Sequence, residues 1–293
     1  MKQWYKVIDV AKCHDCNNCF MADKDEFVGN EWPGYTDAQP RHGHRWVDIL
    51  RRERGQYARN DVAYLPVPCQ QCEEAPCIEA SDGAISKRED GIVMIDLEKA
   101  RGDKDLVQTC PYHAIWWNEE AQIAQKCIFC AHLLDDESWT PCTTRCTHSC
   151  PTDAMATYLV EPKEMEQIIA AEKLQAYLPG LGTRPHTLYK NLYRYTLNFI
   201  TAGVLVDGDC YEGATVTLRS KEGGIACDAA GSGLADAGDT PNLATRTTNF
   251  FGEFKFDGLE YGEYELEVDA GGKKHTATVK VDNDSKNLGF IEL

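Results

Sequence analysis

The chain has 293 residues, enough for about two domains that each bury their own core. Its formal net charge of -17 disfavours nucleic acid and anionic membranes as partners, because phosphate binding depends on clustered Lys and Arg. The sequence contains no run of about 18 apolar residues, and its first residues show neither a signal-peptide core nor a twin-arginine pair, so we expect a cytoplasmic protein.

The number and spacing of the cysteines indicate that the chain binds metal. Of the 14 cysteines, 12 precede residue 151, and most of these lie in Cys-x-x-Cys units, which favours metal ligation over disulfides. Zinc is the competing metal, but zinc sites rarely combine a three-cysteine run with a distant Cys-Pro. In bacterial two-cluster ferredoxins the run is Cys-x2-Cys-x2-Cys-x3-Cys-Pro, and its fourth cysteine ligates the other cluster. Complete runs should therefore occur in pairs, in which each run gives three cysteines to one cluster and its fourth cysteine to the other.

Four runs of this kind can be aligned along the chain. In chain order, their ligand positions one to four are Cys13, Cys16, Cys19 and Asp23; Cys69, Cys72, Cys77 and Ser81; Ala100, Asp103, Leu106 and Cys110; and Cys127, Cys130, Cys146 and Cys150. Both Cys110 and Cys150 are followed by proline.

When the first run is paired with the last and the second with the third, all missing cysteines except the one at position 23 fall into a single ligand set. Three ligand sets result, which we name the cluster-1 group (Cys13, Cys16, Cys19 and Cys150), the cluster-2 group (Cys69, Cys72, Cys77 and Cys110) and the cluster-3 group (Cys127, Cys130, Cys146 and Asp23). The fourth set, positions 81, 100, 103 and 106, has lost all four cysteines together. The spacing therefore predicts one deleted cluster and three retained iron-sulfur clusters.

Asp23 is the unusual ligand position, because a carboxylate is a harder and weaker ligand to iron than a thiolate. Either Asp23 completes a [4Fe-4S] cluster with an altered potential, or that corner iron is labile and the site holds a [3Fe-4S] cluster. In the alternative interpretation Asp23 is a surface acid. Cys142 could replace Asp23 or Cys146 as a ligand, although a free thiol is the simpler interpretation.

Between the first two runs, residues 24–68 form an insertion with a basic and aromatic segment, RHGHRWVDILRRERGQYAR. Arg and Trp are enriched at interface hot spots, so this segment is a candidate docking surface. Its candidate contact residues are Arg41, Arg45, Trp46, Arg51, Arg52 and Arg54. The alternative is a solvated loop whose arginines pair internally with acids.

Later segments predict local structure and the domain boundary. GIVMID and AIWWNEEAQIAQK resemble ferredoxin hairpins, and PKEMEQIIAAEKLQAY predicts an amphipathic helix with Met165, Ile168, Ile169 and Leu174 on one face. From about residue 199, short alternating strands predict a small antiparallel sandwich or barrel. Residues 223–245 predict a long exposed hairpin loop, and Cys210 and Cys227 are expected to be free thiols.

The expected fold class is therefore α+β. Residues 1–198 form a pseudo-repeated, ferredoxin-like iron-sulfur domain with its insertion and trailing helix, and residues 199–293 form an all-β domain of immunoglobulin or transthyretin type.

At these motifs the chain resembles the iron-sulfur subunits of the molybdopterin oxidoreductase family, which normally carry four cysteine runs and four clusters. The missing cluster and the segments GHRWVDILRRERG, KCIFCAHLLDDESW and NFFGEFKFDGLEYGEYELEVDA are similar to the small subunits of pyrogallol-phloroglucinol transhydroxylases and related aromatic hydroxylases. The resemblance implies three [4Fe-4S] clusters here. It also implies a large partner subunit that binds molybdenum through two pterin guanine dinucleotides and acts on polyhydroxylated benzene rings.

The chain departs from this family's pattern at Asp23, where the resemblance implies a cysteine, and at the apparent insertion 223–245. Transhydroxylation needs no net electrons, whereas a resorcinol-type hydroxylase or a catechol dehydroxylase must exchange electrons with an outside carrier. An altered cluster at Asp23 would be compatible with such a change.

We therefore expect a non-catalytic electron-transfer subunit of a heterodimeric enzyme that hydroxylates, transhydroxylates or dehydroxylates polyhydroxylated aromatics. Two alternatives also transfer electrons: a free ferredoxin-like carrier and an electron-transfer subunit of another molybdopterin oxidoreductase. Two others do not: a structural subunit whose clusters only stabilise its fold, and a self-contained enzyme with an open iron site at Asp23. The last is disfavoured because no convergent acid-base set accompanies the site.

Overall fold

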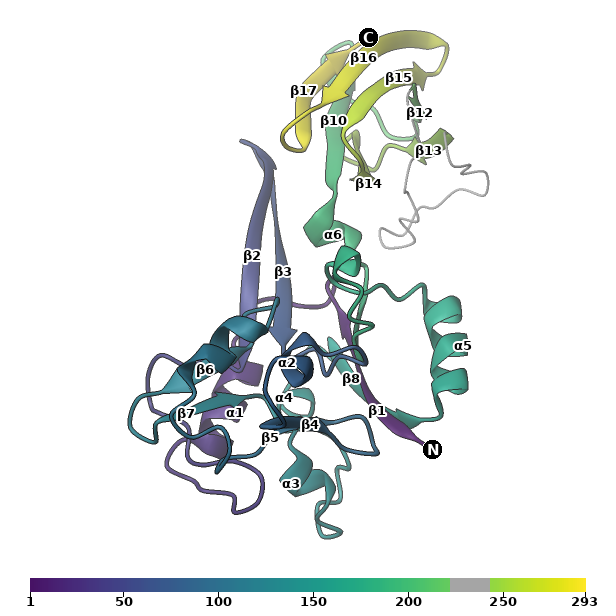
Figure 1. Cartoon of the computed structure of the whole chain (residues 1–293). Coiled ribbons are helices and arrows are strands. Elements are labelled where there is room, and N and C mark those ends of the chain that lie inside the picture. Colours follow the sequence, from purple (N-terminus) through teal and green to yellow (C-terminus); the bar gives the residue numbers. More distant parts are fainter. Residues whose placement is uncertain (222–242) are drawn as a thin grey trace. The chain divides into compact units, whose positions relative to one another are not determined.

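The computed structural model describes residues 1–221 and 243–293 (Figure 1). It divides into two compact units, the first made of Met1–Leu50 and Tyr64–Leu192 and the second of Arg51–Ala63 and Tyr193–Leu293. Most regular elements are strands, and most helices are short. Among the helices in the described ranges, none has both the length and the apolar composition needed to span a membrane.

A three-stranded sheet with one helix packed against it is part of the first unit. Strand β1 (Gln3–Asp9) lies between β8 (Met155–Val160), which is antiparallel to it, and β9 (Thr187–Lys190), which is parallel. Helix α5 (Pro162–Glu172) buries Met165 against Tyr5 and Val7 of β1, with Ile168 and Ile169 partly buried in the same core. The predicted amphipathic helix is thus confirmed. It is shorter than expected, because Lys173 adopts a left-handed conformation that ends it before Leu174.

Short hairpins and helices carry the cysteine runs. The two predicted hairpins are present, β4 (Ile85–Lys87) with β5 (Val93–Ile95), and β6 (Ile115–Asn118) with β7 (Ile123–Lys126). The helical elements around them are α1 (Asn18–Phe27), α2 (Pro76–Glu79), η1 (Lys104–Thr109), α3 (Ala131–Leu134), α4 (Arg145–His148) and η2 (Pro179–Leu181). Each hairpin ends close to a cysteine run, so the strand pairs position the ligand loops.

The structure contradicts the predicted docking surface for two of its six candidate residues, Trp46 and Arg54. The segment forms a hairpin of β2 (Val47–Gln56) and β3 (Arg59–Pro68), and Trp46 and Arg54 are each only 1% exposed. Within the second unit, Arg54 donates to the carboxylates of Asp61 and Asp257, and Arg52 donates to the carbonyl oxygens of Tyr195 and Leu197. The alternative interpretation, internal pairing with acids, therefore describes Arg54.

The second unit contains two sheets around a continuous apolar core. One sheet has the order β11-β10-β14 with β17 also paired to β10, and the other has the order β13-β12-β15-β16. The bounds are α6 (Tyr193–Thr196), β10 (Asn198–Val206), β11 (Asp209–Cys210), β12 (Thr215–Ser220), β13 (Leu243–Thr247), β14 (Glu253–Leu259), β15 (Gly262–Ala270), β16 (Lys273–Val281) and β17 (Lys286–Glu292). Alternate residues such as Val216, Leu218, Phe254, Phe256, Leu266 and Val268 form the core.

The predicted antiparallel pairing in this unit needs two corrections. Strand β17 runs parallel to β10, although the other strand pairs of the unit are antiparallel. The predicted loop 223–245 extends too far toward the C-terminus, because its last residues, Leu243–Thr245, belong to β13 and pair with β12. The rest of that loop, with Cys227, lies outside the described residues, and Cys210 is an exposed free thiol.

Candidate metal centre

The Cys-x-x-Cys units share one backbone feature. In three runs the residue directly before the second cysteine has a positive φ, namely 56° at Asp15, 49° at Gln71 and 57° at Phe129. Few residues other than glycine adopt this conformation, so its repetition at one position marks a common loop geometry. The three loops therefore share this backbone conformation although their side chains differ.

A second repeated feature surrounds the Cys-Pro positions. The backbone N–H of Ala114 donates to Sγ of Cys110 at 3.4 Å, and that of Ala154 donates to Sγ of Cys150 at 3.3 Å. In both cases the donor lies four residues after the cysteine. Such N–H···S contacts stabilise negative charge on sulfur and are one way in which a protein adjusts the potential of a cluster.

The same geometry survives where a cysteine has been lost. Ser81 stands at the fourth position of the second run, and the N–H of Ile85, again four residues later, donates to its Oγ at 2.9 Å. Ala100 and Leu106, from the same lost ligand set, are 0% and 1% exposed and pack with Ile85 in one apolar core. Side chains therefore fill the position that the sequence assigned to a deleted cluster.

The cluster-2 group is brought together in the first unit. Burial raises the pKa of Cys72 to about 12, and the neighbouring thiols of Cys69, Cys110 and Cys77 add to this rise. Burial also raises the pKa of Cys77 to about 11, again with Cys69 and Cys110 as charged neighbours. All four predicted ligands thus lie close enough to affect one another electrostatically.

The cluster-1 group is gathered in the same way. Burial raises the pKa of Cys13, whose charged neighbours include Cys150 and Cys16. For Cys19, burial raises the pKa to about 12, and Cys13 and Cys16 contribute further. The first run and the last cysteine of the fourth run, far apart in sequence, therefore meet.

The cluster-3 group is the most deeply placed, and all four of its members are buried. Burial raises the pKa of Cys127 to about 12, Lys6 opposes this rise, and Cys146 and Asp23 add to it. Cys130 has both Cys146 and Cys127 as charged neighbours. Cys142 is exposed, whereas Asp23 is buried near Cys127.

The cluster-3 group borders both other groups. Cys19 of the cluster-1 group has Cys146 as a charged neighbour, and Cys127 has Cys69 of the cluster-2 group as a neighbour. The three groups therefore follow one another in the order 1, 3, 2.

Asp23 does not behave as a surface acid. It is 5% exposed on α1, and its Oδ2 accepts a hydrogen bond from Nε2 of Gln39 at 3.1 Å. Burial raises its pKa to about 7, although Gln39, Lys24 and Lys6 act in the opposite direction. The cost of burying this carboxylate is thus partly offset by the Gln39 hydrogen bond and by the charges of Lys24 and Lys6.

The donor set fits iron-sulfur clusters. Each group offers thiol or carboxylate ligands that destabilise one another when ionised, and metal ions reverse this by holding thiolates in their ionised form. Backbone N–H groups additionally donate to Cys110, Cys150 and Cys130. The N–H···S contacts and the buried lysines described below were not apparent in the sequence, because both depend on how segments distant in sequence pack.

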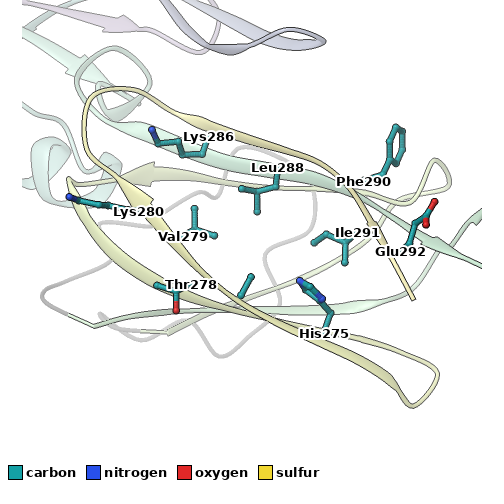
Figure 2. A pocket seen from close by; sticks show the side chains of 10 residues that line it. His275, Thr278, Val279, Lys280, Lys286, Leu288, Phe290, Ile291 and Glu292 are labelled. Carbon is teal, nitrogen blue, oxygen red and sulfur yellow. The ribbon is translucent and has the colours of Figure 1, made fainter.

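The second unit has a shallow groove of about 470 Å³ between β16 and β17. Apolar side chains of Val279, Leu288 and Ile291 line it, Lys280 and Lys286 lie toward one end, and His275 lies toward the other (Figure 2). This groove contains no cysteine.

Comparison with known proteins supports these observations. Residues 60–159 match the model of the 4Fe-4S dicluster domain. The chain is 53% identical over 293 residues, all of both chains, to the pyrogallol hydroxytransferase small subunit of Pelobacter acidigallici.

More distant relatives cover only part of the chain. A selenate reductase subunit of Mesobacillus selenatarsenatis is 28% identical over 64% of this chain and 71% of its own. A thiosulfate reductase electron transfer subunit of Salmonella typhi is 29% identical over 59% of this chain and 84% of its own. The full-length similarity at 53% identity is decisive: this chain belongs to the family of pyrogallol hydroxytransferase small subunits, proteins with a 4Fe-4S dicluster domain.

Proposed function

We propose that the chain is the electron-transfer iron-sulfur subunit of a heteromeric molybdopterin enzyme that hydroxylates, transhydroxylates or dehydroxylates polyhydroxylated aromatics. The observation that carries the proposal is the full-length similarity to a pyrogallol hydroxytransferase small subunit, in a chain whose cysteines gather into three groups. A small subunit implies a large catalytic partner. For that partner we propose molybdenum bound by two pterin guanine dinucleotides, in a heterodimer with this chain in the cytoplasm.

The three groups would hold three [4Fe-4S] clusters. When bound, these clusters would transfer electrons one at a time between an outside carrier and the partner subunit. The chain itself supplies the thiolates, donates backbone hydrogen bonds to three of the sulfurs, and excludes water from the buried cluster-3 group. In the order 1, 3, 2 the cluster-3 group would connect the two outer clusters.

We further propose that Asp23 is the fourth ligand of the cluster-3 group. Its burial, its position beside Cys127 and the exposure of Cys142 support this assignment. A carboxylate binds iron more weakly than a thiolate does, so the same site can hold a [3Fe-4S] cluster when the corner iron is lost.

For the fold we propose a ferredoxin-like pseudo-repeat in residues 1–198 and a domain of immunoglobulin or transthyretin type in residues 199–293. The repeated loop conformation before the second cysteine supports the first assignment. The two sheets around one apolar core support the second.

The proposed function is tested by anaerobic purification of the tagged chain from its native host, with iron, sulfide and molybdenum analysis and identification of the chains that co-purify. We expect a large molybdopterin chain and about twelve iron atoms per small subunit, four for each cluster. The complex should also turn over di- or trihydroxybenzenes.

Recovery of the chain alone, with iron but no molybdenum, would favour the free ferredoxin-like carrier. Recovery with a molybdopterin chain that acts on other substrates would favour the electron-transfer subunit of another oxidoreductase.

A further inference from the structure

Two lysines are buried in the first unit. Lys6 and Lys126 are the only Lys or Arg side chains buried in the described part of this unit, and each is 1% exposed. Among the residues that the structure describes, neither forms a salt bridge with a carboxylate. An ammonium group removed from water is costly unless a nearby anion compensates it. The described residues therefore compensate these charges only weakly, although the Asp23 carboxylate interacts electrostatically with Lys6 without forming a salt bridge with it.

Lys6 is held against the cluster-3 group. Its Nζ donates to Sγ of Cys146 at 2.8 Å and to Oγ1 of Thr144 at 2.8 Å. The same Nζ lies 5.0 Å from the centre of the Phe129 ring, a favourable position for a cation. Lys6 comes from β1 and Cys146 from α4, so the contact joins segments 140 residues apart. Two hydrogen bonds and one aromatic face fix the ammonium group beside the sulfur.

Lys126 lies between the cluster-2 group and Cys127 of the cluster-3 group, and its hydrogen bonds go to carbonyl oxygens rather than to sulfur. Its Nζ donates to the carbonyl oxygens of Val93 and Cys127. Val93 packs in the same core as Cys72 and Cys110. Lys6 thus contacts the cluster-3 group and Lys126 lies between the cluster-2 and cluster-3 groups, whereas no buried lysine contacts the cluster-1 group in the described structure.

A cluster with its thiolate ligands is an anion, and one-electron reduction makes it more negative. A fixed ammonium group beside it therefore stabilises the reduced form more than the oxidised form. We propose that Lys6 raises the reduction potential of the cluster held by the cluster-3 group, and that Lys126 does the same for the cluster-2 group. This inference rests on the cluster ligands of the proposed function.

The lysines would offset an effect of burial. A low-dielectric environment disfavours the more highly charged reduced cluster, and the cluster-3 group is the most deeply buried of the three. Without Lys6 the middle cluster would accept an electron less readily than its neighbours and would obstruct transfer between them. Lys6 is thus a positioning and tuning residue for electron transfer.

The test is an EPR-monitored redox titration of the anaerobically purified complex with Lys6→Met, Lys126→Met or both. Methionine approximates the shape of lysine without its charge. The wild type should show three one-electron waves. Lys6→Met should change the equilibrium constant of one wave at least tenfold toward the oxidised form, which is about 59 mV for one electron. Lys126→Met should shift a different wave most, and the double variant should shift both.

Two further variants make the result decisive. Lys163→Met, at an exposed position on α5, should shift no wave. Lys6→Gln keeps a hydrogen-bond donor but removes the charge, and it should lower the same wave as Lys6→Met. Loss of four iron atoms in both Lys6 variants would contradict the proposal, because Lys6 would then serve assembly.

Two other outcomes distinguish the role of the lysines from the three-cluster assignment. Three waves in the wild type that none of the lysine variants moves would overturn the role of the lysines and leave the proposed function intact. Fewer than three waves in the wild type would instead refute the three-cluster assignment itself.

Discussion

At the residue scale, the spacing of the cysteines predicted three ligand groups. The swap rule paired residues more than 100 positions apart, such as Cys13 with Cys150, and the structure brings them together. It could be applied because most ligand positions keep the ferredoxin offset from the next, with longer gaps only before Cys77 and Cys146. Lys6 and Lys126 could not be predicted in this way. A lysine in a strand normally faces solvent, and only the packing of β1 against α4 shows that Lys6 contacts a sulfur.

Asp23 gives a direct test at this scale. Asp23→Ala leaves the cluster-3 group with three thiol ligands, so we expect loss of about one iron atom per chain and an EPR signal of an oxidised [3Fe-4S] cluster. Asp23→Cys is the matched control and should retain the full iron content with no such signal. If Asp23→Ala keeps all of its iron, Asp23 is not a ligand.

At the scale of elements, the sequence predicted the hairpins and the amphipathic helix because their apolar periodicity is strong. It did not reveal the long β2–β3 hairpin, whose arginines suggested a solvent-facing surface. The burial of Arg54 follows from its pairing with Asp61 and Asp257, which lie 7 and 203 residues away. Local sequence cannot show a partner at the larger of these separations.

The buried pairing of Arg54 predicts a local stability effect in the second unit. Its side chain is 0% exposed, and breaking a buried ion pair from one side costs about 3 kcal/mol. Arg54→Met should therefore increase hydrogen exchange of β14 amides roughly 100-fold, as measured by mass spectrometry. The exposed Arg219→Met serves as the control. Equal exchange in the two variants would show that Arg54 contributes little.

At the scale of the whole molecule, the change from cysteine-rich runs to alternating strands predicted two structural parts. The observed second unit begins at Tyr193 rather than at residue 199, and it also includes Arg51–Ala63, the tip of the hairpin. A contiguous boundary was predicted because composition changes only once along the chain, near residue 200. The parallel pairing of β17 with β10 was likewise not predictable, since alternation in a strand does not specify its direction.

The most direct test of the central claim is spin quantification of the fully reduced complex, together with iron and sulfide analysis. Three clusters in the order 1, 3, 2 predict about three unpaired spins per small subunit, with magnetic interaction between the middle cluster and each outer one. Integration to two spins or fewer from a preparation with about twelve iron atoms, or signals without such interaction, would contradict the account.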